Sequence, residues 1–184
     1  MRLVPIAAAC VALTLAACST APPVPAAPSA SASAGAPIDA KAAFARLKAL
    51  DGAWSGGIGK PDGPKAEVVY RVTGAGSAVM ETQFPGTAHE MVTVYHLDGK
   101  DLLLTHYCAA GNQPRMKLAR ATENELVFEF AGGTNLDAAR DFHMHDATMR
   151  FPARDRVEAT WYSWGGGKPD PNGTARFFLS RKAG

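Results

Sequence analysis

Apolar and polar residues alternate with a period of two along most of residues 54–181, as they do in a β-strand that buries one face. Short turn signals, such as Asp98-Gly99 and the glycines at 165–167, interrupt this pattern at regular intervals. Many short strands separated by tight turns are typical of an all-β sandwich or barrel. About ten strands joined in this way favour an antiparallel, up-and-down meander that closes on itself and leaves no exposed edge. The predicted strands are 54–58, 67–73, 78–84, 90–97, 101–108, 115–121, 125–130, 142–151, 157–164 and 175–181.

A single segment before these strands has the period of a helix. Asp39 can cap its first turn, and Gly52 can end it. Its apolar stripe consists of Ala42, Ala43, Phe44, Leu47 and Leu50. The sequence therefore predicts one short N-terminal helix, which we expect to cover an end of the barrel.

Residues 1–17 have the layout of an export signal. Arg2 supplies one positive charge, and the apolar residues that follow end in small side chains directly before Cys18. This stretch is shorter than the roughly 20 residues needed to span a bilayer. Small residues followed by cysteine resemble the bacterial lipobox, in which the cysteine is acylated after cleavage. The resemblance implies an exported protein anchored by lipid on Cys18, and Ser19 at the next position favours the periplasmic face of the outer membrane.

Composition divides the rest of the chain. Residues 18–37 consist mainly of Ala, Pro and Ser and carry no charge, which predicts an extended, disordered tether. Residues 38–184 then form one domain of ordinary size. The formal net charge is +2 and the basic residues form no cluster, so we do not expect nucleic acid as a partner. Cys108 is the single cysteine of this domain, which must therefore be stable without an internal disulfide.

The segment Gly52-Ala53-Trp54 lies where the helix meets the first strand. It resembles the Gly-x-Trp signature that opens barrels of the lipocalin and fatty-acid-binding superfamily. The resemblance implies that an arginine from the last strand packs over Trp54 and closes the barrel; Arg181 is placed for this role, with Arg176 as the alternative. Residues 91–116 are also similar to uncharacterised exported bacterial lipocalin-like proteins. A barrel of this size can enclose an apolar cavity, so we expect a small, hydrophobic ligand.

Strand alternation selects the residues that would line this cavity. With a hairpin at 97–102, Tyr95 and His106 point to one face, which is mostly apolar and should be the inner one. His143 and His145 lie two residues apart and therefore share a face. The predicted pocket residues are Met91, Tyr95, Leu104, His106, Cys108, His143, His145, Met149 and Trp161.

A histidine pair at alternate strand positions plus a third histidine is one way to hold a transition metal, because neutral imidazole suits zinc and copper. If both faces are interior, His106, His143 and His145 would converge on one metal ion. The opening residues also resemble the nitrobindin-type haem barrel at Gly52, Trp54 and Gly56, whereas Ile58 and Lys60 stand at its later glycine positions. That family takes its haem ligand from a histidine near the C-terminus, and no histidine follows His145.

No group of residues reaches the arrangement of a catalytic site. Cys108 and His106 share a strand face, but such neighbours are not an oriented pair of nucleophile and base. The sequence therefore favours a membrane-anchored periplasmic carrier of a small hydrophobic molecule. Two alternatives stay open: a structural or envelope-assembly lipoprotein whose barrel is filled with side chains, and a histidine-based metal- or haem-binding protein.

Overall fold

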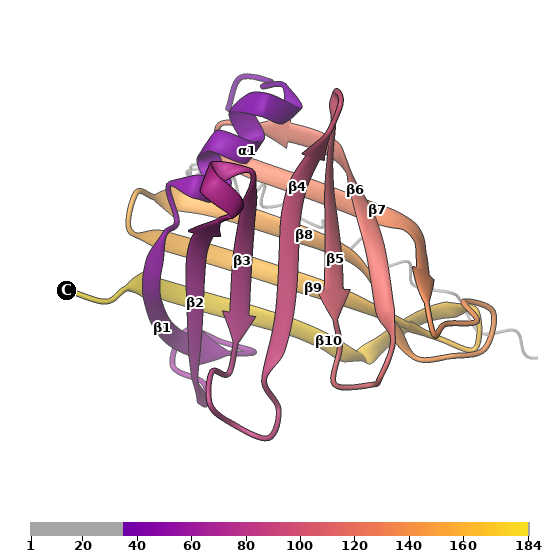
Figure 1. The fold of residues 1–184 in the computed structure, drawn as a ribbon. Helices are drawn as coiled ribbons and strands as arrows, with labels where there is room; N and C mark the ends of the chain where they lie inside the picture. Colours follow the sequence, from indigo (N-terminus) through magenta and orange to yellow (C-terminus); the bar gives the residue numbers. More distant parts are fainter. Residues whose placement is uncertain (1–34, 184) are drawn as a thin grey trace, which may run out of the picture. The chain divides into compact units, whose positions relative to one another are not determined.

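Strands account for most of the residues between Gly52 and Arg181. In the computed structural model, which describes residues 35–183, ten antiparallel strands form a closed barrel (Figure 1). Each strand pairs with its neighbours along the chain, and the last strand pairs with the first. The prediction of an all-β, up-and-down barrel is confirmed. The strands are β1 Gly52–Ile58, β2 Lys65–Thr73, β3 Ala78–Gln83, β4 Met91–Asp98, β5 Asp101–Tyr107, β6 Gln113–Thr122, β7 Glu125–Thr134, β8 His143–Ala153, β9 Arg156–Gly165 and β10 Lys168–Arg181.

The largest difference from the predicted strands lies in β10. Its glycine- and proline-rich beginning is expected to be a loop, with the strand confined to 175–181. The strand instead begins at Lys168, directly after a tight turn from β9. A register shift between Asp170 and Ala175 accommodates the residues that do not pair with β9.

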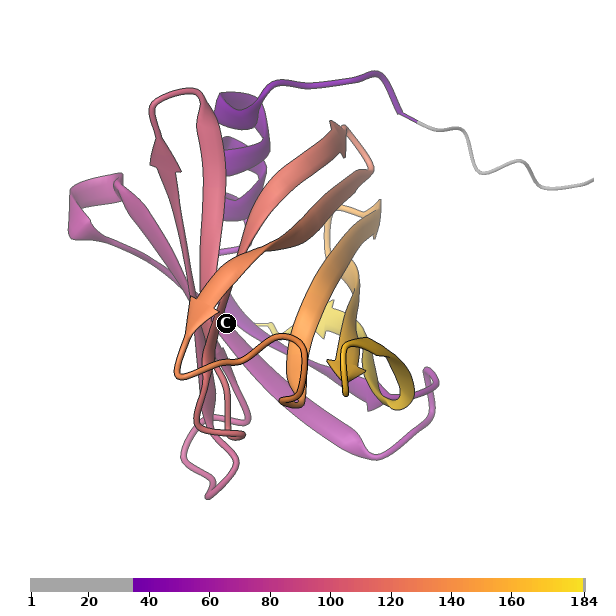
Figure 2. The same ribbon diagram turned by 90° about the vertical axis from the view of Figure 1, so that its right-hand side faces the viewer.

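Helix α1 (Ala40–Lys48) begins as the sequence predicts. The Asp39 side chain accepts a hydrogen bond from the Ala42 backbone N–H at 2.8 Å, which caps the first turn. The helix lies across one end of the barrel, next to β4, β5 and β6 (Figures 1 and 2). We call this the helix end and the opposite one the far end. No helix within residues 35–183 is long and apolar enough to cross a membrane. The buried residues of the helix are Ala43, Phe44 and Leu47.

The chain just before the helix is bonded to the barrel. The Glu123 backbone N–H donates to the Ala36 carbonyl at 3.1 Å, and Pro37 forms an isolated bridge with Thr122. Residues 36 and 37, at the end of the predicted tether, therefore contact the backbone of the barrel. Cys18, the predicted signal peptide and the remainder of the tether lie outside the described residues.

Arg181 and Trp54 close the barrel at the helix end. They are partners across β10 and β1, and the Arg181 guanidinium lies 4.4 Å from the centroid of the Trp54 ring. The same guanidinium donates to the carbonyls of Asp51 and Ala49, both at 2.7 Å. The Trp54 indole N–H donates to the Leu50 carbonyl at 2.8 Å. One arginine side chain therefore covers the indole and also bonds to two carbonyls of the segment between the helix and β1.

Strands β1 and β10 approach each other closely at Gly56. A Cβ atom at this position would lie 1.8 Å from the Phe178 carbonyl oxygen, far inside van der Waals contact. Only glycine fits there, so the glycine two residues after Trp54 has a packing role in this chain.

Candidate functional site

Inward-facing side chains differ in size between the two ends of the barrel. The helix end contains large buried residues such as Trp54, Leu102 and Phe151. Towards the far end, the cross-strand neighbours of Trp161 are Ala147 in β8 and Ala175 in β10. The interior is therefore occupied by bulky groups next to the helix, whereas small side chains flank Trp161.

Buried polar side chains cross the interior on four adjacent strands. Each has at most 2% of its surface exposed. Four of them are successive partners across β2 to β5, in the order Tyr70, Glu81, Thr93 and His106. We call the whole set the interior polar cluster. It consists of Tyr70, Glu81, Gln83, Thr93, Tyr95 and His106.

Glu81 is the acid of the interior polar cluster, and two neighbours donate to it. The Tyr95 hydroxyl donates to one carboxylate oxygen at 2.5 Å, and the Gln83 amide donates to the other at 2.8 Å. Burial raises the pKa of Glu81, and the two hydrogen bonds offset part of that rise. Burial and the nearby Glu81 carboxyl also raise the pKa of the Tyr70 and Tyr95 hydroxyls, so both tyrosines are neutral.

His106 lies at one edge of the cluster with one ring nitrogen free. Its Nδ1 is 2.9 Å from the Thr93 hydroxyl, and its ring centroid is 4.8 Å from that of Trp161. The buried Nε2 of His106 has no hydrogen-bond partner, and neither does the buried Tyr70 hydroxyl. Burial lowers the pKa of His106 to about 4. The imidazole is therefore neutral at about pH 7, and Nε2 can form one hydrogen bond as a donor or an acceptor, according to the tautomer.

Among the described residues, no positive side chain lies inside the barrel to balance Glu81. Within residues 35–183, no lysine or arginine is buried. The half-buried ones, Arg46, Lys48 and Arg181, lie at the helix end with their charged groups over aromatic rings. The cluster is consequently an environment for uncharged groups.

His143 and His145 form a separate group between β7 and β8. The pairing of these strands stops at Phe128 and Ala147, and Figure 2 shows the two strands spreading apart beyond that point. The register of β8 against β9 shifts between Met144 and Asp146, so the intervening His145 occupies a β-bulge. Its ring is stacked between Phe130 and Trp164, with centroid distances of 4.4 Å and 3.9 Å.

A hydrogen-bond chain connects these two histidines. The His143 Nδ1 is 2.8 Å from the Asp141 carbonyl, which can only accept, so this nitrogen bears a proton. The His143 Nε2 and the His145 Nδ1 lie 2.9 Å apart and share a hydrogen bond. Burial lowers the pKa of His145, which favours the neutral form of its ring.

The metal site predicted at His106, His143 and His145 is not present in the structure. Among the described residues, no three His, Cys, Asp or Glu side chains gather closely enough to hold a metal ion. His106 contacts Thr93 and Trp161 instead. The prediction assumed unbroken alternation along the strand, and the bulge at His145 interrupts that alternation.

The remaining predicted pocket residues divide into two groups. Met91 is only half-buried, opposite Gln83 at the start of β4. Cys108 lies beyond the end of β5, in a turn where its backbone N–H donates to the Asn112 carbonyl at 3.1 Å, and its thiol is free. The second group of predicted pocket residues is buried inside the barrel and consists of Tyr95, Leu104, Met149 and Trp161.

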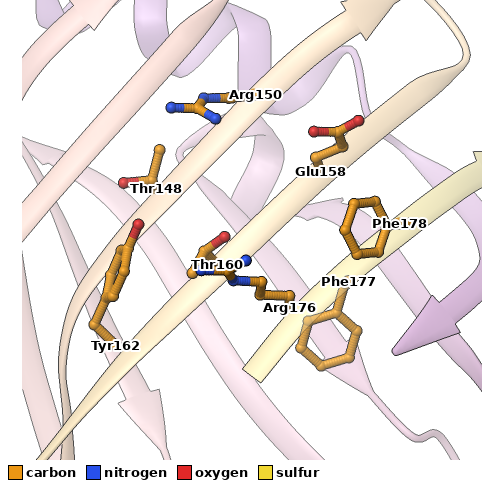
Figure 3. Close-up of a pocket in the computed structure, with 8 residues that line it drawn as sticks. All are labelled: Thr148, Arg150, Glu158, Thr160, Tyr162, Arg176, Phe177 and Phe178. Atoms are coloured by element: carbon orange, nitrogen blue, oxygen red, sulfur yellow. The ribbon is translucent and has the colours of Figure 1, made fainter. Parts of the chain in front are cut away.

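The outer face of β8, β9 and β10 has a groove with a volume of about 290 Å³ (Figure 3). Arg150 on this face is paired with Glu125 at 2.7 Å. Arg176 is exposed in the same groove, so Arg181 and not Arg176 is the arginine that closes the barrel. The groove is lined by Thr148, Arg150, Glu158, Thr160, Tyr162, Arg176, Phe177 and Phe178.

No protein-family profile matches this chain, and no curated protein is similar to it. The function of the interior polar cluster must therefore be inferred from its own geometry.

Sequence reasoning missed Tyr70, Glu81 and Gln83. In residues 78–83 the face that contains Met80 looks at least as apolar as the face that contains Glu81, so the binary pattern does not predict a buried acid. Strand register is the signal that could have found it. Once Thr93 is assigned to the inner face of β4, antiparallel pairing places Glu81 directly opposite.

Proposed function

We propose that this protein binds a small, mainly apolar molecule inside its barrel, next to the interior polar cluster. The observation that supports this most directly is the pair of buried polar groups without partners, the His106 Nε2 and the Tyr70 hydroxyl. A buried polar group without a hydrogen bond costs about 1–3 kcal/mol. Such groups in a native interior are normally bonded to ordered water or to a ligand.

The neighbours of His106 suit an apolar ligand. Trp161 offers an aromatic surface beside the imidazole, and its cross-strand neighbours on β8 and β10 are alanines, the smallest side chains that can line an interior. Small-molecule sites typically combine apolar and aromatic walls with a few polar groups that fix the orientation of the ligand. The resemblance of the Gly52–Trp54 segment to lipocalin barrels is a further argument for a ligand inside the barrel.

The same proposal includes export and a lipid anchor on Cys18, based on the signal-like pattern of residues 1–17. Metabolic labelling with a fatty acid in a bacterial host tests this directly. Label should be incorporated into the wild type and into a Cys10→Ala variant but not into Cys18→Ala. Equal labelling of all three proteins would contradict the anchor. Membrane fractionation of the labelled wild type separately tests the outer-membrane location that Ser19 favours.

Native mass spectrometry of the protein purified from a bacterial host tests the ligand site. We expect extra mass that is released as an apolar molecule, or uptake of a fluorescent apolar probe by the empty protein. Ala147→Leu adds volume beside Trp161 inside the barrel and should reduce uptake, whereas Thr148→Leu adds the same side chain on the outer face and should not. A bare mass together with no uptake by the wild type would refute the proposal.

A second candidate is a structural or envelope-assembly role for a filled barrel. The large buried residues at the helix end favour it, and so does the groove on the outer face. This role predicts the bare mass and the absence of probe uptake described above, so the same experiment distinguishes the two functions.

A further inference from the structure

The charges inside the barrel discriminate among possible ligands. Glu81 is buried, and no buried lysine or arginine accompanies it in the described part of the chain. A carboxylate or phosphate brought to this place would lose its hydration without gaining a cation, and it would lie near another acid. Burying an unpaired charge is strongly unfavourable.

We propose that the barrel selects uncharged ligands with a hydroxyl or carbonyl oxygen that bonds to the free Nε2 of His106, and that it rejects fatty acids and other anions. This inference rests on the proposed interior binding site and specifies the chemical class of its ligand.

The surroundings of His106 explain the preference for an uncharged oxygen group. The Thr93 hydroxyl at Nδ1 can donate or accept, so it is compatible with either neutral tautomer of the imidazole. A ligand hydroxyl can likewise bond to Nε2 in both cases, and a carbonyl can bond when Nε2 bears the proton. The lowered pKa of His106 keeps the ring uncharged at neutral pH, so the ring does not attract anions.

Cationic ligands are disfavoured for a different reason. Both carboxyl oxygens of Glu81 already accept hydrogen bonds, from Tyr95 at 2.5 Å and from Gln83 at 2.8 Å. Burial also shifts Glu81 towards its neutral form. An ammonium group would therefore have to compete with these donors for the only acid in the cluster.

Three probes of equal chain length test this inference: 1-octanol, octanoate and octylammonium. Their affinities for the purified full-length protein can be measured at about pH 7 by displacement of a fluorescent apolar probe. Fewer than about one in 100 octanoate molecules is protonated at that pH, so we expect octanoate to bind on the order of 100-fold more weakly than octanol. Octylammonium should also bind more weakly than octanol.

Two variants test the role of His106. His106→Leu should weaken octanol binding by about fivefold, because one hydrogen bond to the ligand is lost. His96→Leu makes the same substitution at a half-buried position on the opposite face of β4 and should leave the affinity unchanged.

The outcomes separate this inference from the proposed function. Octanoate or octylammonium binding as tightly as octanol would overturn the charge preference while leaving interior binding intact. Failure of the wild type to take up any apolar probe, so that there is nothing to displace, would overturn the interior site itself. If His106→Leu does not fold, the ranking of the three probes on the wild type still decides the question.

Discussion

Replacing His106 with glutamine should make the stability of the protein less sensitive to acid. The pKa of His106 is about 4 in the folded protein and 6.5 for a model histidine. Between these values the unfolded chain binds a proton that the folded protein does not, so the free energy of unfolding falls as the pH decreases. A pKa shift of this size lowers the free energy of unfolding by about 3 kcal/mol once the pH is below both pKa values. About 2 kcal/mol of this decrease should occur between about pH 7.5 and 5.

Urea unfolding followed by tryptophan fluorescence at several pH values measures this effect. The quantity to compare is the change in unfolding free energy with pH, not its absolute value, because the substitution also disturbs the contact with Thr93. Glu81, whose raised pKa acts in the opposite direction, is present in both proteins and largely cancels. His96→Gln is the matched control and should keep the wild-type dependence. If His106→Gln loses as much stability as the wild type between about pH 7.5 and 5, His106 is not buried in its neutral form, and the reasoning is wrong.

Three further substitutions, two of them with a matched control variant, test the closure of the barrel and its buried acid. Arg181→Ala should lower the free energy of unfolding in urea titrations by about 2–4 kcal/mol, because it removes the stacked guanidinium and two hydrogen bonds. Its control, Arg176→Ala, should change the free energy of unfolding by less than about 0.5 kcal/mol. Gly56→Ala should lower the free energy of unfolding by at least about 3 kcal/mol or prevent folding, because the added Cβ would overlap the backbone of β10. Its control is Gly165→Ala, whose added Cβ would meet no atom within 4 Å, and circular dichroism should show this variant folded. The raised pKa of Glu81 opposes the effect of His106, because ionisation of the buried carboxyl lowers the stability as the pH rises through its folded pKa. Without that opposing contribution, Glu81→Gln should gain stability more steeply than the wild type between about pH 5 and 7.5 in urea titrations, and an unchanged slope would show that the carboxyl is not responsible.

Most of the fold could be predicted because local patterns and the closed barrel agree. Asp98-Gly99 sits in a tight hairpin, Asp39 caps the helix, and alternation identified most strands. The beginning of β10 could not be predicted, since its glycines and prolines are usual in loops. Only pairing with β9 keeps that segment extended, and pairing of that kind is not visible in a local window of sequence.

The candidate site was only partly predictable for a related reason. The inner positions of Tyr95 and His106 follow from alternation within one hairpin, and both are buried. The convergence of His106 with His143 and His145 required an unbroken register across several strands. A single bulge at His145 was enough to prevent it. Glu81 was missed because a buried acid contradicts the polarity rule on which the inner face is usually assigned.

The pairing of the first strand with the last has a consequence for how the molecule is made. The Arg181 guanidinium bonds to the Asp51 carbonyl across 130 residues of chain, so this contact requires almost all of the barrel sequence to be present at once. Contacts of such long range form slowly, because the entropy of the intervening chain must be lost first. A partly synthesised chain therefore cannot close the barrel before its C-terminal strand is available. Loss of the C-terminal strand would leave β1 and β9 with unpaired edges, and such a truncated chain should aggregate.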